Sequence, residues 1–240
     1  MAGKKTVIVT GASQGIGAAI TRAFLDRGYN VVATSQGFGG TDFVAASNLA
    51  LVEGDIRAEA TADKLVQAAM ATFGSIDHLV NNAGIFFGKP FTEYTVEDFG
   101  RFVSINMEGF FLVTQRAVRQ MLAQGNGGSV TTITAALADN PMAGHPASIA
   151  MMSKGGLNAI TRSLAMEYAK QHIRFNAVAP GVVNTPLQKG ATKESLADRT
   201  PMGSISEPTD IAAAVIYLVE ASHVTGEVLH VDDGAHVGRW

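Results

Sequence analysis

The chain has 240 residues and a formal net charge of −3. Its length suits one large α/β domain, and its charge does not indicate a nucleic-acid surface. Hydrophobic residues make up 47% of the chain and charged residues 16%, which is enough apolar material for a substantial core. The absence of cysteine excludes disulfides, thiolate metal sites and cysteine nucleophiles, and it fits a reducing compartment.

The N-terminal stretch MAGKKTVIVTG enters an apolar run at once and shows neither the apolar segment nor the cleavage site of a signal peptide. No apolar run approaches the ~18 residues that a membrane-spanning helix needs. We therefore expect a soluble, cytoplasmic protein with no membrane partner, no nucleic-acid partner and no metal site.

Short β-branched runs alternate with longer helical patterns along the chain. The expected strands begin at Thr6, Asn30, Leu49, Ile76, Gly128, Ile173 and Glu227. Each run is brief and lacks apolar–polar alternation, which is typical of strands buried on both faces. Helical patterns include 58–74, 95–122 and 147–170. This alternation predicts a single α/β domain over 1–240, a Rossmann-type doubly wound parallel sheet of about seven strands with helices on both faces.

The segment 188–210 is the most polar and least patterned part of the chain. Two interpretations are open. Long loops of this kind often form lids over a site, and they are also found as solvated surface loops.

The run TGASQGIG at 10–17 follows the first expected strand and opens a helix. Gly11, Gly15 and Gly17 permit a tight turn and let the backbone approach a pyrophosphate closely. The helix N-terminus offers free N–H groups and a partial positive charge to the phosphates. In this strand–turn–helix context the motif predicts a dinucleotide site; the alternative is a structural turn without a ligand.

Further motifs follow in order along the chain. They are GDI at 54–56, NNAG at 81–84, Asn106 within SINMEG, Lys154 within SKGGL, NAVAPGVVNTP at 176–186 and VTGEVLHVDDG at 224–234. With the glycine turn, they resemble the short-chain dehydrogenase/reductase family over nearly the whole chain. The resemblance implies a nicotinamide dinucleotide as cofactor and a small-molecule carbonyl or alcohol as substrate.

The resemblance also implies which residues hold the cofactor. They are Gly11, Ser13, Gln14, Gly15, Ile16 and Gly17 at the first turn, Ser35, Asp55 and Ile56 towards the adenosine, Asn82, Ala83 and Gly84 at the ribose and sheet core, Lys154, and Pro180, Gly181, Val183 and Thr185 at the nicotinamide. Ser35 stands where the family's NAD enzymes usually carry aspartate, and Gln36 stands where many NADP enzymes carry arginine. Because neither charge is present, we expect NAD or NADP without a preference.

Family members transfer the proton through a tyrosine whose pKa a lysine one helical turn later lowers. The interval of four residues puts both groups on one face of a helix. Lys154 is present here, and Asn106 matches the asparagine that supports a proton relay. The tyrosine position, however, is Ala150, and the position of the substrate-orienting serine is Ala135.

Three side chains are candidates for a replacement. His145 can titrate near neutral pH and lies just before the Lys154 helix, although it could equally be a surface loop residue. Thr134 carries the hydroxyl adjacent to Ala135 and could simply pack in its strand. Ser148 has the character of a helix cap.

Three functional hypotheses follow. The first is a divergent dehydrogenase or reductase with a relocated or water-supplied proton, the second a nucleotide-binding pseudoenzyme that acts as a sensor or partner subunit, and the third a family member with other chemistry such as an elimination. The complete cofactor motifs and Lys154 favour the first. Phe86, Phe87 and Phe91 suggest an apolar or ring-bearing substrate, and core packing would explain them equally well.

The resemblance finally implies a homo-oligomer, in particular a tetramer. The helices expected at 95–122 and 147–170 usually pair across a dimer axis, and the last strand usually builds a second interface. Apolar stripes on these helices would be costly for a monomer to expose. The residues expected in these interfaces are Phe102, Phe110, Leu157, Leu164 and the terminal Trp240.

Overall fold

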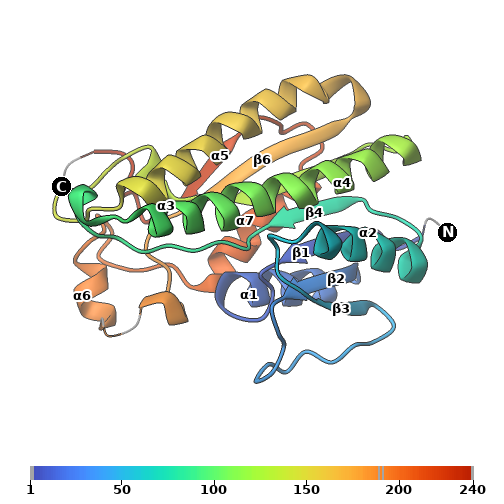
Figure 1. Ribbon diagram of the computed structural model, residues 1–240, viewed down its shortest axis with the longest axis horizontal. Coiled ribbons are helices and arrows are strands. Elements are labelled where there is room, and N and C mark those ends of the chain that lie inside the picture. The colour runs from blue at the N-terminus through green and yellow to red at the C-terminus, as the bar shows by residue number, and fades with distance from the viewer. Residues whose placement is uncertain (1–2, 189, 191, 239–240) are drawn as a thin grey trace.

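A parallel sheet of seven strands forms the centre of the protein in a computed structural model, which describes residues 3–188, 190 and 192–238 (Figure 1). The strands are β1 (Thr6–Thr10), β2 (Asn30–Ser35), β3 (Leu49–Glu53), β4 (His78–Asn81), β5 (Gly128–Ile133), β6 (Ile173–Pro180) and β7 (Val228–Val231). Their order in the sheet is β3-β2-β1-β4-β5-β6-β7, and each neighbouring pair is parallel. The predicted fold class is therefore confirmed.

Helices cover both faces of this sheet. They are α1 (Gly15–Asp26), α2 (Glu59–Phe73), α3 (Val96–Phe102), α4 (Gly109–Gln124), α5 (Ser148–Glu167), α6 (Lys193–Ala197) and α7 (Pro208–Glu220). Buried residues of α1 and α7 share one apolar cluster, and those of α2, α4 and α5 share another. Among the residues that the structure describes, no helix is long and apolar enough to cross a membrane.

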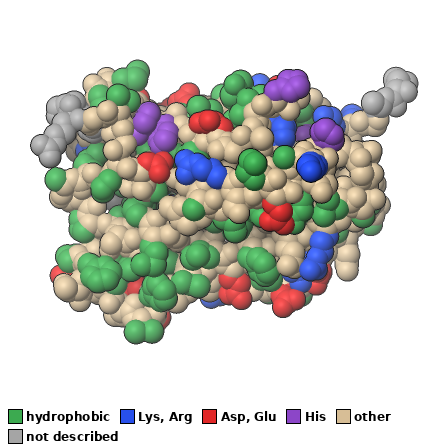
Figure 2. Space-filling view, turned by 90° about the horizontal axis from the view of Figure 1, so that it is seen from above, with side chains coloured by type: hydrophobic (Ala, Val, Ile, Leu, Met, Phe, Trp, Pro, Cys, Tyr) green, Lys and Arg blue, Asp and Glu red, His purple; other side chains and the backbone are tan. Residues whose placement is uncertain are grey.

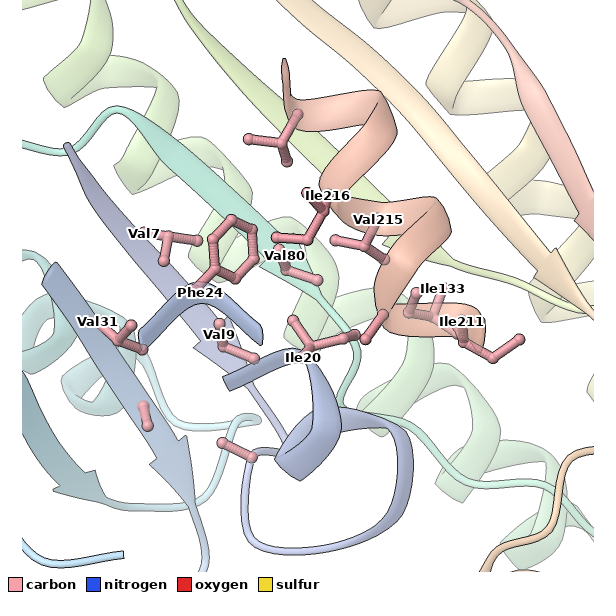
Figure 3. Close-up of a cluster of buried hydrophobic side chains, with 14 of the residues drawn as sticks. Val7, Val9, Ile20, Phe24, Val31, Val80, Ile133, Ile211, Val215 and Ile216 are labelled. Atoms are coloured by element: carbon pink, nitrogen blue, oxygen red, sulfur yellow. The ribbon is translucent and has the colours of Figure 1, made fainter. Parts of the chain in front are cut away.

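The cluster under α1 and α7 fixes the start of the chain against the sheet. Phe24 of α1 is fully buried and lies between Val7 of β1 and Ile216 of α7 (Figure 3). Such a buried aromatic side chain contributes about 3–5 kcal/mol relative to alanine. The packing holds the first residues of α1 at the carboxyl end of β1, where the glycine turn lies.

The helix expected over 95–122 differs from its prediction in the middle. A π-helical segment, Val103–Glu108, separates α3 from α4. Such segments are rare and often occur at functional sites. This one contains Asn106, which is 2% exposed. The α4 helix then begins at Gly109, where a Cβ would come within 2.8 Å of the Ile56 side chain, so a close approach to the loop after β3 requires glycine there.

Candidate active site

A cleft of about 1490 Å³ runs along the carboxyl ends of the strands. Between β1 and β4 the strand order reverses, and such a switch point is where open α/β sheets bind ligands. Each residue to which the sequence assigned cofactor binding lines the cleft, from Gly11 to Thr185. Among the proposed catalytic residues, Lys154, Thr134 and His145 line it as well. Asn106 lines a smaller cavity that shares Lys154 with the cleft.

The first turn is built to bring backbone N–H groups to a ligand. Gly11 and Gly15 have φ values of +66° and +54°, which favour glycine. A Cβ on Gly17 would stand 2.1 Å from the carbonyl oxygen of Gly11, so the turn closes only with glycine there. The N-cap residue Gln14 makes no side-chain capping bond, which leaves the first N–H groups of α1 available to an anion. The turn therefore fits a pyrophosphate.

Hydrogen bonds hold this turn against the end of β4. The hydroxyl of Thr10 accepts the backbone N–H groups of Asn82 and Ala83, both at 3.0 Å. In return the amide Nδ2 of Asn82 donates to the carbonyl oxygens of Thr10 and Gly11, also at 3.0 Å. Two strands that are far apart in sequence thereby share one rigid edge of the cleft.

The adenosine end of the cleft has no charge that would select between the two dinucleotides. The hydroxyl of Ser35 lies 2.8 Å from that of Ser13, and Gln36 beside them is neutral. Asp55 is paired with Arg57, whose hydrogen bonds lower the pKa of the Asp55 carboxyl. The hydroxyls of Ser13 and Ser35 and the amide of Gln36 could bond to a ribose hydroxyl or to the oxygens of a phosphate.

Lys154 is the cation at the centre of the site. Its side chain comes from α5 and is 8% exposed. In the described part of the chain, Nζ donates one hydrogen bond, to the carbonyl oxygen of Ile133 at 2.8 Å. Burial lowers the pKa of Lys154 to about 8, because a poorly solvated ammonium is disfavoured. Further acceptors, such as ribose hydroxyls, would complete its hydrogen bonding.

Asn106 fastens the segment after β4 to α5. Its Oδ1 accepts the N–H of Ile85 at 2.8 Å, and its Nδ2 donates to the carbonyl oxygen of Ile85 and to the hydroxyl of Ser153. A cavity of about 10 Å³ lies between Asn106, Thr132 and Lys154. A polar cavity of that size has room for about one water molecule.

The position one turn before Lys154 is closed by apolar side chains. Ala150 is fully buried and shares a cluster with Phe102, Phe86 and Phe87. The Phe87 ring lies 4.6 Å from that of Phe102, centroid to centroid. A tyrosine at 150 would therefore have to displace aromatic side chains already packed there.

The other residues singled out from the sequence have varied surroundings. Phe86 lines the cleft, whereas Phe91 is 66% exposed. Thr134 is buried, and its hydroxyl donates to the carbonyl oxygen of Val178 at 3.3 Å. His145 is half-buried in a loop, where Nδ1 lies 3.4 Å from the Ala143 carbonyl oxygen. Ser148 begins α5 and is exposed.

The polar segment expected at 188–210 contributes to the cleft wall through Arg199 and Thr200; residues 189 and 191 lie outside the described residues. Ser204 and Ser206 donate to the two carboxylate oxygens of Asp233, at 2.6 and 3.1 Å. Asp233 has a φ of +55°, a left-handed conformation that aspartate tolerates better than most residues. These bonds tie the segment to the turn after β7.

Sequence reasoning missed two residues in that same turn. His236 lines the cleft, and its Nδ1 lies 2.9 Å from both carboxylate oxygens of Asp232. The side chain of Asp232 is only 2% exposed. An aspartate followed four residues later by a histidine was a signal in the sequence, but His236 falls just beyond the last motif of the resemblance.

Comparisons with known proteins agree with this geometry. Residues 11–236 match the family model described as enoyl-(acyl carrier protein) reductase. A 3β-hydroxysteroid dehydrogenase of Eggerthella lenta is 38% identical over 244 residues, which cover 96% of this chain and 93% of that protein. The crystal structure of a 3-ketoacyl-(acyl-carrier-protein) reductase from Brucella melitensis in complex with NADH is 31% identical, with a TM-score of 0.90 and coverage of 98% and 99%. ElxO with NADP bound is 26% identical, with a TM-score of 0.89 and coverage of 98% and 100%.

Gly17→Ala tests the closeness of the first turn. We expect the variant to bind nicotinamide dinucleotides at least about tenfold more weakly, because a displaced turn that loses about one to two kcal/mol of binding free energy has that effect. We also expect it to melt at a lower temperature. Gly100→Ala in α3 is the matched control, because nothing lies within 4 Å of its Cβ. It should leave binding unchanged and stabilise the helix by up to about 1 kcal/mol. Calorimetry with NAD(H) and NADP(H) and thermal melting measure both; equal binding by wild type and Gly17→Ala would contradict the turn's role.

Lys154→Met tests the burial of the ammonium. The pKa of Lys154 in the folded protein is about 8, below its ordinary value of 10.5, so protonation favours the unfolded chain. The penalty is fully present below pH 8 and disappears as the pH rises towards 10.5. We expect Lys154→Met without cofactor to melt above wild type at pH 7, with a difference that shrinks by pH 10. A melting temperature for the variant that stays below wild type at both pH values would contradict this account.

Proposed function

Because this chain belongs to the short-chain dehydrogenase/reductase family, we propose that it is an NAD(P)-dependent oxidoreductase that interconverts a carbonyl compound and an alcohol. The observation that carries the proposal is the glycine turn locked against β4, with Lys154 on the wall of the same cleft. The relatives named above are a dehydrogenase and reductases, and no finding favours a protein that binds the nucleotide without turning over a substrate.

The residues present fit a nicotinamide dinucleotide. Gly11–Gly17 would hold the pyrophosphate through backbone N–H groups, Lys154 would bond to the nicotinamide ribose, and Pro180–Thr185 would hold the nicotinamide. Gly15 supports this arrangement, because a Cβ there would stand 3.4 Å from the Thr185 side chain, so the first turn and the 180–185 segment face each other. When bound, the nicotinamide supplies or accepts a hydride.

The proposal includes a divergent proton donor. Ala150 and Ala135 stand where the family usually carries its tyrosine and serine, and neither side chain can exchange a proton. Apolar packing around Ala150 supports a rebuilt site over a site that lost one side chain. General acid–base assistance is worth about 10²–10⁴-fold, so we propose that another titratable group at the cleft supplies the proton.

We propose an apolar or ring-bearing substrate. Ile85, Phe86 and Met142 line the cleft beyond Lys154, and apolar walls of this kind bury hydrocarbon surface. The relative from Eggerthella lenta, a hydroxysteroid dehydrogenase by name, supports the ring-bearing class. NAD and NADP both remain within the proposal.

A cofactor titration and a substrate panel test this function. We expect calorimetry to show binding of NAD(H) or NADP(H), and cyclic and open-chain ketones and alcohols to reveal a hydride transfer that can be followed by absorbance. Ala150→Tyr should lower the activity found by at least about tenfold, because the new ring overpacks the cluster. A rise by an order of magnitude would instead indicate a decayed tyrosine site. No binding of either nucleotide at millimolar concentration would contradict the proposed function.

We also propose a homo-oligomer, at minimum a dimer through α4 and α5 and most simply a tetramer. The apolar residues that the sequence analysis expected in the interfaces do not support this proposal. Phe102, Phe110 and Leu157 are buried within the chain, Leu164 packs partly against the core, and Trp240 lies outside the described residues. Other apolar side chains of these helices are exposed: Phe111, Leu122, Met152, Ile160 and Met166.

The molecular surface seen from the side of α5 carries clusters of hydrophobic side chains, with acidic, basic and histidine side chains among them (Figure 2). Patches of this kind on a helical face are typical of an interface. Light scattering at micromolar concentration should therefore give a multiple of the 25.1 kDa chain mass. Phe111→Glu with Met152→Glu should shift the mass towards the monomer. A monomeric wild type would refute the proposal.

A further inference from the structure

Two histidine–aspartate pairs lie together at the carboxyl end of β7. His236 contacts Asp232, and His230 of β7 contacts Asp139, with Nε2 3.1 Å from Oδ2. The two imidazole rings are stacked, with centroids 4.0 Å apart and planes 14° apart. Of the two histidines, His236 lines the cleft.

The Asp232 carboxylate fixes the His236 ring. It accepts the backbone N–H groups of Gly234 and His236 at 3.2 and 2.8 Å, as well as the ring Nδ1. An ionised carboxylate only accepts hydrogen bonds, so Nδ1 of His236 is the donor. In neutral imidazole the lone pair then lies on Nε2. A base oriented in this way by a buried carboxylate is a recurrent element of catalytic sites.

The backbone around the pair places it beside the part of the cleft where the nicotinamide is expected. The N–H of Gly181 donates to the carbonyl oxygen of Val231 at 2.9 Å. A Cβ on Gly181 would stand 2.7 Å from the Cα of Asp232. On the other side, the Asn140 amide donates to the backbone carbonyl of His236. His236 is thus held between the 180–183 segment and the loop that follows Thr134, which are two walls of the same cleft.

The other titratable groups of the cleft lack this arrangement. His145 has no carboxylate partner in the described residues, and its Nδ1 is 3.4 Å from a carbonyl of its own loop. Lys154 donates to the carbonyl oxygen of Ile133, and we expect its other hydrogens to bond to the nicotinamide ribose. Arg199 stays protonated at all relevant pH values. Among these groups, His236 alone is both oriented by a buried carboxylate and 35% exposed along its side chain.

We propose that His236, oriented by Asp232, exchanges the proton with the substrate oxygen and so replaces the missing tyrosine. The proposal rests on the oxidoreductase function above. In reduction, the substrate carbon receives the hydride, the carbonyl π pair becomes a lone pair on oxygen, and the Nε2–H of protonated His236 gives its proton to that oxygen. His236 becomes neutral and takes a proton from solvent. In oxidation, Nε2 accepts the hydroxyl proton, the O–H pair forms the carbonyl π bond, and the hydride would pass from the carbon to the oxidised nicotinamide.

Three titratable side chains lie around His236. They are Asp232 from its own turn, His230 from β7 and Asp139 from the end of the 3₁₀ turn Ala136–Ala138. Arg199 lines the same cleft. A variant of His236 removes the imidazole that lines the cleft.

His236→Gln is the principal test, because glutamine keeps a polar side chain and cannot exchange a proton near neutral pH. With the carbonyl compound identified in the panel, we expect kcat to fall by about 10²–10⁴-fold, the limb of the pH profile near neutrality to vanish, and calorimetric binding of the dinucleotide to stay unchanged. Asp232→Asn should lower kcat in the same direction, since an amide can donate to the ring and hold it in the other tautomer, and it does not stabilise an imidazolium. His236→Ala should regain part of the rate when imidazole is added, which a purely structural role would not show.

His223→Gln is the matched control, because His223 is exposed and lies outside the cleft lining. His145→Ala tests the competing donor. Full turnover with an unchanged pH limb in His236→Gln, or loss of that limb in His145→Ala instead, would overturn the proposal.

Nitrogen NMR of the histidine rings gives a readout without cofactor or substrate. We expect neutral His236 to carry its proton on Nδ1, and Asp232→Asn to redistribute it. A proton on Nε2 of neutral His236 in the wild type would contradict the proposed orientation of this ring by Asp232, whatever the activity. A wild type that binds the dinucleotide and turns over nothing in the panel would contradict the oxidoreductase function, whereas a loss confined to His236 and Asp232 variants supports the pair.

Discussion

The contact of the first glycine turn with the end of β4 is the constraint on which the rest of the site depends. Gly17 leaves no space for a Cβ against Gly11, and Asn82 donates to the carbonyl oxygens of Thr10 and Gly11 at the start of that turn. Parallel neighbours β1 and β4 are joined through a long crossover, so nothing local in the chain keeps their ends together. The hydrogen bonds do so, and they set the direction in which α1 presents its first N–H groups.

A second constraint acts around Lys154. Asn106 donates its two amide hydrogens to the carbonyl oxygen of Ile85 and to the hydroxyl of Ser153. These bonds join the segment after β4 to the helix that carries Lys154. The lysine is left with a single carbonyl partner in the described residues. A buried ammonium with one hydrogen-bond acceptor is poorly solvated and therefore unfavourable. A ligand with hydroxyl oxygens would accept further hydrogen bonds from this ammonium. The burial of Lys154 would therefore contribute to the affinity for a ribose.

The sheet could be predicted almost strand by strand, because each buried parallel strand is a brief β-branched run that ends in a turn motif. The π-helical segment inside 95–122 could not be predicted, since no proline or glycine pair marks it in the sequence. It contains Asn106, whose side chain accepts the N–H of Ile85. The placement of the glycine turn and Lys154 in one cleft followed from motif order. The covering of Ala150 by phenylalanines and the pairing of His236 with Asp232 depend on tertiary contacts, which residue spacing alone does not reveal.

The backbone of Asp233 limits how this part of the protein can vary. Its left-handed φ would be relieved by glycine or asparagine, whereas the hydroxyl groups of Ser204 and Ser206 require two acceptor oxygens from its side chain. Few residue types meet both demands. Substitutions at Ser204 or Ser206 and substitutions at Asp233 should therefore have non-additive effects on stability, because the three side chains share two hydrogen bonds.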